Sequence, residues 1–217
     1  MRLGKIILVS SPKGGSGKSV LARHILVSAS QSGISSIGID FDQQGTFDKW
    51  AQRREATRAM FPEFAGVEVR AAHLRDWRAG LLLAAQADLA VIDTPPSVED
   101  HLAAISQLAE AASLIVVPAV CTQDDIDSVI PWIEILKQRK THKAVIVLNR
   151  ANRRTTSFAR IRGRLIKIAD VCPVEIPLLE DVHVPSSKGL TLLDYTKSRG
   201  QEPFEEVWAY IKRQINL

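Results

Sequence analysis

A short run rich in glycine and lysine near the start of the chain has the composition of an anion-binding loop. It joins an apolar segment, Lys5–Ser10, to a helix-length segment, Lys18–Ser32, and reads Ser11-Pro12-Lys13-Gly14-Gly15-Ser16-Gly17-Lys18-Ser19. The glycines allow successive backbone N–H groups to turn toward phosphate oxygens, and the start of the helix adds partial positive charge. Lys18 is spaced to reach the terminal phosphates of a nucleotide, and Ser19 to ligate Mg²⁺. The run therefore predicts a site for a nucleoside triphosphate with Mg²⁺.

The loop departs from the strict Walker A pattern, which has a glycine, four further residues and then Gly-Lys-Ser or Gly-Lys-Thr. Ser11 stands where the first glycine is expected. The stretch resembles the deviant Walker A motif of the ParA/MinD family of ATPases. The resemblance implies ATP as the nucleotide, held by Lys13, Gly14, Gly15, Ser16, Gly17, Lys18 and Ser19. It also implies catalytic roles for Lys18 and for Lys13, which would reach across an ATP-dependent homodimer to the second nucleotide.

Two acidic residues, Asp40 and Asp42, follow the apolar run Ser36–Ile39. Because alternate residues of an extended chain face the same way, both carboxylates could face the phosphate site. The segment is similar to the family's Asp-x-Asp-Pro-Gln-Gly sequence, with Gln43 in place of proline. The resemblance implies that Asp42 orients the attacking water and that Asp40 lies in the outer shell of Mg²⁺. Phosphoryl transfer needs a positioned water and little covalent help, which agrees with these roles.

A second acidic position follows the apolar run Leu89–Ile92, which leads into Asp93-Thr94-Pro95-Pro96. A buried strand that ends in aspartate resembles a Walker B element. The resemblance implies that Asp93 holds Mg²⁺ through a water, as third metal-site residue beside Ser19 and Asp40. The sequence from Val116 to Pro118, followed by Asp124–Asp127, also resembles a ParA-type pattern.

Two further positions are implied to contact the base of the nucleotide. Asn149 follows the apolar run Ala144–Leu148, and the resemblance places it beside the adenine. Pro177, after Ile176, is similar to the segment that closes over the other side of the base. For Asn149 an ordinary turn role stays open.

Short apolar runs alternate with longer helical patterns along the chain. The predicted strands are Lys5–Ser10, Ser36–Ile39, Val67–Arg70, Leu89–Ile92, Leu114–Val117, Ala144–Leu148 and Val174–Ile176. Most are apolar at consecutive positions, which is typical of strands buried on both faces of a parallel sheet. The predicted helices are Lys18–Ser32, Thr46–Met60, Trp77–Ala87, Val98–Ala111, Asp124–Arg139, Ser157–Ile168 and Pro203–Ile215. The alternation predicts a three-layer, doubly wound α/β fold, mostly parallel, in one P-loop NTPase domain over residues 1–217.

The composition is that of a globular protein rather than a disordered or membrane-spanning one. Hydrophobic residues make up 46% and charged residues 24% of the 217 residues, which is ordinary for a folded domain. No stretch reaches the roughly 18–20 apolar residues of a membrane span. Cys121 and Cys172 lack metal-ligand spacing, so we expect reduced thiols in a cytoplasmic protein. The resemblance to ParA-type ATPases implies that it is nucleoid-associated.

Positive charge is concentrated between Arg150 and Lys167, a stretch that contains no acid. On a helix, Arg160, Arg164 and Lys167 share one face, and Ile161, Leu165 and Ile168 share the opposite one. One interpretation is a solvated helix face. The other is a surface for non-specific DNA formed by Arg153, Arg154, Arg160, Arg164 and Lys167.

The last predicted helix, Pro203–Ile215, places Phe204, Val207, Trp208, Ile211 and Ile215 on one face. MinD-type relatives end in a basic amphipathic helix that lies on the bilayer. Here acids precede the helix and bases end it, a pattern that suits the helix dipole. We therefore expect the apolar face to pack on the domain rather than on a membrane.

The resemblance implies a short ParA-type partition ATPase without an N-terminal DNA-binding helix-turn-helix. ATP-bound dimers would bind DNA non-specifically, and a ParB-like or other cargo adaptor would stimulate hydrolysis. Alternatives are a related ATPase that positions conjugation machinery, a microcompartment or a polysaccharide synthase, a MinD-like membrane-associated ATPase, a metabolic ATP-dependent ligase or kinase, and a non-hydrolysing scaffold.

Overall fold

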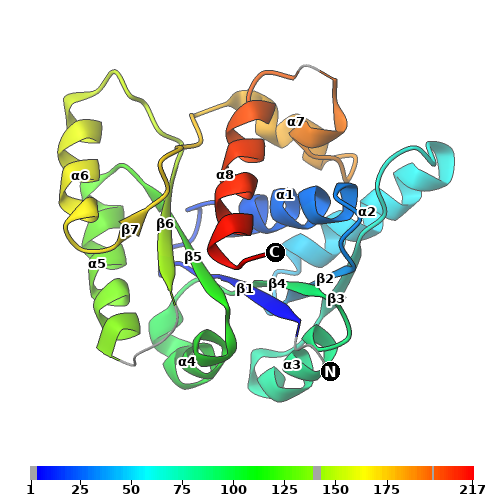
Figure 1. The fold of residues 1–217 in the computed structure, drawn as a ribbon, viewed down its shortest axis with the longest axis horizontal. Coiled ribbons are helices and arrows are strands. Elements are labelled where there is room, and N and C mark those ends of the chain that lie inside the picture. Colours follow the sequence, from blue (N-terminus) through cyan, green and yellow to red (C-terminus); the bar gives the residue numbers. More distant parts are fainter. Residues whose placement is uncertain (1–3, 139–142, 197) are drawn as a thin grey trace.

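A single seven-stranded sheet forms the centre of the protein (Figure 1). The computed structural model describes residues 4–138, 143–196 and 198–217. All paired strands are parallel, in the order β3-β2-β4-β1-β5-β6-β7. The strands are β1 Lys5–Val9, β2 Ser36–Asp40, β3 Glu68–Ala71, β4 Leu89–Asp93, β5 Leu114–Val120, β6 Ala144–Asn149 and β7 Asp170–Val171. These findings confirm the predicted fold class.

Helices cover both faces of the sheet, in two separate hydrophobic clusters. The α-helices are α1 Lys18–Gln31, α2 Thr46–Met60, α3 Trp77–Ala84, α4 Leu102–Ala111, α5 Gln123–Gln138, α6 Thr156–Ile166, α7 His183–Ser186 and α8 Gln201–Gln214. Short 3₁₀ turns lie at Leu74–Asp76, Val98–His101, Glu180–Val182 and Leu192–Asp194. Helices α1, α2 and α8 pack on one face of the sheet, and α3 to α6 pack on the other.

Neighbouring residues of β1, β4, β5 and β6 enter different clusters. Leu8 belongs to the cluster under α3 to α6, whereas Val9 belongs to the cluster under α1, α2 and α8. Because both faces are covered, the strands need apolar residues at consecutive positions, which explains the sequence pattern.

The strand register brings three chain segments to one edge of the sheet. Strand β4 lies between β1 and β2, and Asp93 is level with Val9 on one side and with Asp40 on the other. The loops that follow these positions therefore start side by side at the carboxyl edge, which is where open α/β sheets bind ligands.

Helix α8 packs its apolar face into the core, as the sequence predicted. Phe204, Val207, Ile211 and Ile215 are each at most 2% exposed, and Trp208 is 8% exposed. That face is therefore not available to a bilayer. Within the described residues, no helix is long and apolar enough to cross a membrane.

The expected strand Val174–Ile176 is wrong; β7 is Asp170–Val171 instead. The later segment bonds to Leu148 of β6 through the Ile176 N–H, at 2.8 Å, and is followed by an isolated bridge between Ala151 and Pro177. Proline has no backbone N–H to donate to a ladder, and the segment is bounded by Pro173 and Pro177.

Two helix boundaries also shifted. The expected helix Val98–Ala111 begins as a 3₁₀ turn after Ser97, whose φ of 58° is left-handed, so α4 starts at Leu102. Helix α3 ends at Ala84 rather than Ala87. The expected end of the fifth helix, Arg139, lies outside the described residues.

Candidate nucleotide-binding site

The phosphate-binding loop connects β1 to α1, and two of its glycines have a left-handed backbone. The φ angles are 76° at Gly15 and 100° at Gly17, values that L side chains rarely adopt. A Cβ at Gly17 would also lie 2.0 Å from Nδ2 of Asn149, whereas one at Gly15 would meet no atom within 4 Å. Gly17 is therefore required both by backbone conformation and by a close approach from β6.

Lys18 is 6% exposed and lies within the loop. Its Nζ donates to the carbonyl oxygens of Lys13, at 2.9 Å, and Ser11, at 3.3 Å. Burial lowers the pKa of Lys18, while the charges of Asp93, Asp42 and Asp125 act to raise it. The ammonium is thus held beside three carboxylates at the start of the loop, and it can exchange loop carbonyls for phosphate oxygens.

Asp93 is fully buried at the end of β4. Neither of its carboxylate oxygens accepts a hydrogen bond of acceptable geometry from any described residue. Burial raises the pKa of Asp93 to about 7, while the nearby Ser19 hydroxyl favours the charged form. A buried carboxylate without a donor is costly, unless a cation or a proton neutralises it.

This position fits the Mg²⁺ that the fold family implies. Oxygen ligands from a serine hydroxyl and a carboxylate suit Mg²⁺, which keeps several waters and takes phosphate oxygens as further ligands. Across the described ranges, no group of three His, Cys, Asp or Glu side chains could hold a metal ion. Ser19 and Asp93 would therefore hold the ion together with the nucleotide rather than as a free-standing metal site.

Asp40 differs from Asp93 in its hydrogen bonding. One oxygen accepts the N–H of Asp42 at 3.0 Å, and the other accepts those of Phe47 and Asp48 at 2.9 Å each. Burial raises the pKa of Asp40, and these three N–H groups oppose the rise. Asp40 thus holds the first turn of α2, and its place in the shell of Mg²⁺ stays a prediction.

Asp42 lies in the turn between β2 and α2, half-buried beside the phosphate loop. Its Oδ1 accepts the N–H of Gln44 at 2.9 Å, and its backbone N–H is held by Asp40. Gln43, which replaces the family's proline, is exposed. The turn is therefore ordered by carboxylate–backbone bonds, without the rigid ring of a proline.

Asn149 and Pro177 lie on the wall of one cavity of about 300 Å³ next to the loop. The cavity is lined mostly by apolar side chains, from Gly17, Val20, Asn149, Arg150, Pro177, Leu178, Leu179 and Val182. The Asn149 amide donates to the Ser16 carbonyl at 2.8 Å, and its Oδ1 accepts the Arg150 N–H at 2.9 Å. The structure thus joins the two predicted base contacts in one pocket, while Asn149 itself supports the loop. Their contact with a base stays a prediction.

Two residues close to the site have no role in the sequence-based prediction. Asp125 is 5% exposed, and its Oδ2 accepts the Val120 N–H at 2.7 Å. Burial raises its pKa, and the charges of Lys13 and Lys18 lower it. Arg23 is 6% exposed on α1. The sequence could have pointed to Arg23 only as a charged residue between Ala22 and His24, within a helix that is buried over most of its length.

The five predicted DNA-binding residues, Arg153, Arg154, Arg160, Arg164 and Lys167, are all exposed. They lie on α6, in the loop before it and, for Lys167, directly after its last residue, at one end of the molecule (Figure 1). Arg153 is ion-paired with the buried Glu175, so part of its charge is compensated. The hydrophobic residues Ile161 and Leu165 are buried, as the helix pattern predicted. DNA binding by this surface stays a prediction.

Comparison with known proteins decides the family. A model of the CobQ/CobB/MinD/ParA nucleotide-binding domain matches residues 7–192. The chain belongs to this family. Its phosphate loop, Asp93 and the cavity beside Gly17 all lie within the matched range. A search among curated protein sequences gave no match.

Several solved structures have a similar fold. MinD from Pyrococcus horikoshii OT3 with Mg-ADP is 16% identical, with a TM-score of 0.76 over 97% of this chain and 96% of that one. An ATP complex of a Cyanothece McdA variant is 16% identical, with a TM-score of 0.75 over 99% and 97%. A Borrelia burgdorferi B31 protein assigned to plasmid partition, bound to AMPPNP, is 14% identical, with a TM-score of 0.74 over 97% and 99%. At these identities the likeness shows the fold.

Proposed function

We propose that this family member is a Mg²⁺-dependent ATPase. The observation that carries the proposal is Asp93: a fully buried carboxylate with no backbone hydrogen-bond donor among the described residues, next to the Ser19 hydroxyl and attracted by the charge of Lys18. A cation completes this arrangement, and the loop binds the phosphates that accompany it. The neighbouring apolar cavity has room for a base. Structural neighbours with bound AMPPNP, ATP or Mg-ADP support the choice of nucleotide.

The residues of the chain divide the work of hydrolysis. Lys18 leaves the carbonyls of Lys13 and Ser11 and binds the β- and γ-phosphates. Ser19 and Asp93 would hold Mg²⁺, the carboxylate of Asp93 supplying the negative charge. When bound, the ion neutralises charge that develops on the phosphates. Asp42 accepts a hydrogen bond from the attacking water and orients it toward the γ-phosphate.

We further propose that ATP switches the protein between a monomer and a dimer. Lys13 is half-buried at the mouth of the loop, where it can reach a nucleotide on a second subunit. The dimer would present the basic residues of α6 to DNA, and an adaptor protein on a cargo would stimulate hydrolysis. Plasmid or chromosome partition is the process that this cycle serves best, and the Borrelia neighbour supports it.

A membrane-associated role is less well supported. The apolar face of α8 is already buried against the sheet, so membrane binding by that helix would require it to leave the core.

Other cargoes for the same ATPase cycle are conjugation machinery, a microcompartment or a polysaccharide synthase. The gene next to this one distinguishes them from partition, because a small DNA-binding adaptor encoded there supports partition.

The test measures nucleotide affinity, phosphate release and molar mass by light scattering, with and without ATP, Mg²⁺ and duplex DNA. Lys18→Ala should lose ATP binding, because it removes the cation of the loop. Lys13→Ala is the matched variant: it should bind ATP but stay monomeric. Unchanged ATP affinity in Lys18→Ala would contradict the site, and ATP-dependent dimers of Lys13→Ala would contradict the switch.

A further inference from the structure

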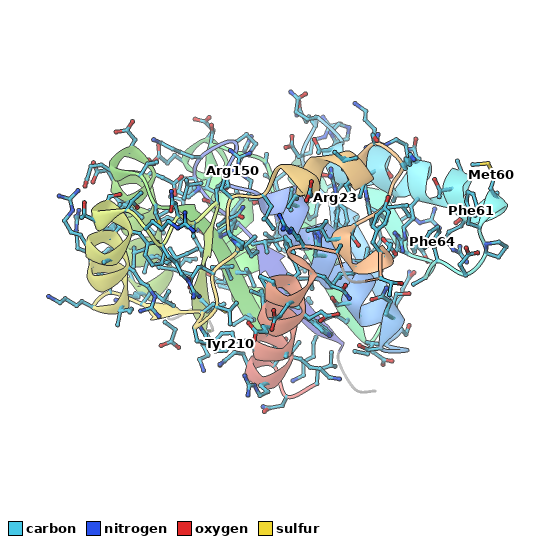
Figure 2. All side chains as sticks on the ribbon, turned by 90° about the horizontal axis from the view of Figure 1, so that it is seen from above. Arg23, Met60, Phe61, Phe64, Arg150 and Tyr210 are labelled. Atoms are coloured by element: carbon cyan, nitrogen blue, oxygen red, sulfur yellow. The ribbon has the colours of Figure 1, made fainter. Side chains whose placement is uncertain are left out.

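Arg23 is a buried cation in the helix that starts at the phosphate loop. It lies on α1, is 6% exposed, and stacks over the ring of Trp50 at 5.7 Å. Arginine is almost never buried unless it is paired. Yet no ion pair joins Arg23 to a carboxylate among the described residues, and its Nε is buried without a partner there. Figure 2 shows Arg23 near the centre of the molecule, close to the orange segment that contains α7.

The guanidinium donates two hydrogen bonds to two different segments. Nη2 donates to the Thr46 carbonyl at 2.8 Å, and Nη1 donates to the Ser186 hydroxyl at 2.7 Å. Thr46 is the first residue of α2, and Ser186 is the last residue of α7. One side chain thus joins the phosphate-loop helix to two segments that are far apart in sequence.

The Thr46 contact acts on the turn that carries Asp42. Asp40 holds this turn through the N–H groups of Phe47 and Asp48, and Arg23 holds it through the carbonyl of Thr46. Gly45, between Asp42 and Thr46, has a left-handed φ of 62°. Its N–H donates to the Asp42 carbonyl at 2.8 Å, so the position of Asp42 depends on how firmly the first turn of α2 is fixed.

The Ser186 contact acts on the segment that follows the wall of the base cavity. That wall includes Leu179 and Val182. Helix α2 holds the same segment through further bonds: Trp50 Nε1 to the Leu190 carbonyl at 3.3 Å and Thr57 Oγ1 to the Lys188 carbonyl at 2.7 Å. Because Arg23 is a residue of α1, its bond to Ser186 connects α1 to the same segment.

We propose that Arg23 is a positioning residue that fixes the Asp42 turn for hydrolysis and joins it to the segment behind the base cavity. It does not touch the nucleotide; it acts through Thr46 on Asp42 and through Ser186 on the cavity wall. The inference rests on the proposed ATPase function, because Asp42 must orient water for the positioning to matter. Its attraction to Asp40 and Asp93 also stabilises the buried charge of Arg23.

The first test compares Arg23→Met with Arg53→Met. Arg53 is exposed and also donates to Ser186, at its backbone oxygen, but among the described residues it has no hydrogen bond to Thr46. Arg23→Met should lower kcat about 10- to 100-fold, as expected for a displaced catalytic group, with ATP affinity changed less than about threefold. Arg53→Met should leave kcat near wild type. An unchanged kcat in folded Arg23→Met overturns the proposal.

A double-mutant cycle then tests whether the effect passes through Asp42. In an Asp42→Asn background, Arg23→Met should lower kcat little further, because the group that it positions is already disabled. A full additional loss would overturn the proposal. If Arg23→Met does not fold, Arg23→Lys takes its place, since it keeps the charge but cannot donate to both Thr46 and Ser186 in the same fork geometry.

Hydrogen exchange gives a readout that does not depend on turnover. In the wild type, Mg-AMPPNP should protect residues 41–48 and 186–190 together, and in Arg23→Met the second segment should lose that protection. Equal protection in both proteins overturns the coupling. If the wild type binds nucleotide without hydrolysing it, the proposed ATPase function is contradicted. The exchange result still tests whether Arg23 couples the two segments.

Discussion

Asp40 and Asp93 are register partners on adjacent parallel strands, yet their carboxylates have opposite surroundings. Asp40 accepts three backbone N–H groups, whereas Asp93 accepts none from the described residues and has only the Ser19 hydroxyl beside it. Both are buried. The first carboxylate is therefore a structural anion that organises a turn, and the second is available to a cation.

Replacing Asp93 by asparagine should stabilise the protein without nucleotide at pH 8. The folded pKa is about 7, above the ordinary 3.8. The folded state thus binds the proton more tightly, and stability is lost as pH rises from about 4 through 7. Asp93→Asn removes this loss, so the free energy of unfolding at pH 8 should rise by roughly 4 kcal/mol. Urea unfolding at pH 8 and at pH 4 measures it, and an equal gain at both pH values would contradict the prediction.

The same variant should lose the added stability that Mg²⁺ gives to the ATP complex. Ser19 remains, but an amide does not supply the negative charge that holds the hydrated ion. Thermal melts with ATP, with and without Mg²⁺, compare the variant with the wild type. A Mg²⁺-dependent shift as large as that of the wild type would remove Asp93 from the metal site.

Lowering the pH should destabilise the fold through His24. This buried ring stacks on Phe204 at 3.6 Å, and burial lowers its pKa to about 4 from the ordinary 6.5. Its contribution is present above pH 6.5 and is lost as pH falls through 4, by up to roughly 3 kcal/mol. Asp93 acts with the opposite sign in this window, so the measurement uses the Asp93→Asn background. Adding His24→Gln should flatten the profile; an unchanged slope would exclude His24 as its source.

Alanine at Gly17 should be far more harmful than alanine at Gly15. Both have a left-handed φ, which costs a residue with a Cβ about 1–2 kcal/mol. Only at Gly17 would the new Cβ meet Nδ2 of Asn149, 2.0 Å away. Nucleotide titration and unfolding curves measure both variants. Because the clash is with Asn149, Gly17→Ala should recover part of its affinity when combined with Asn149→Ala, and an absence of recovery would point to backbone strain alone.

Reversing charge on α6 should weaken DNA binding in the ATP-bound state. Arg160→Glu with Arg164→Glu should lower affinity roughly tenfold or more and reduce the slope of log affinity against log salt by about two. Arg75→Glu with Arg78→Glu is the control. Both arginines are exposed, Arg75 in the 3₁₀ turn before α3 and Arg78 in the first turn of α3, which lies away from α6 (Figure 1). Equal loss in both pairs would mean that net charge, rather than the α6 surface, governs binding.

Local sequence patterns were sufficient to predict the fold class and the order of strands and helices along the chain. Consecutive apolar residues in Leu89–Asp93 require cover on both faces, and the glycines of the phosphate loop admit few backbone conformations. These are local properties, so they can be inferred without knowing which strands are neighbours. The misplaced last strand shows where local information fails, because the bonds of Val174–Ile176 depend on β6 and on two flanking prolines.

The burial and hydrogen bonding of Asp40, Asp93 and Arg23 became known only from their tertiary contacts. Asp40 and Asp93 both end apolar strands, and nothing local distinguishes the one with three donors from the one with none. In the sequence, Arg23 is an ordinary helix residue. Its hydrogen-bond partners Thr46 and Ser186 lie 23 and 163 positions further along the chain, so only the folded structure shows them. Burial, pKa and hydrogen-bond partners depend on the strand register and on contacts between distant segments, because the dielectric environment of a charge is set by everything packed around it.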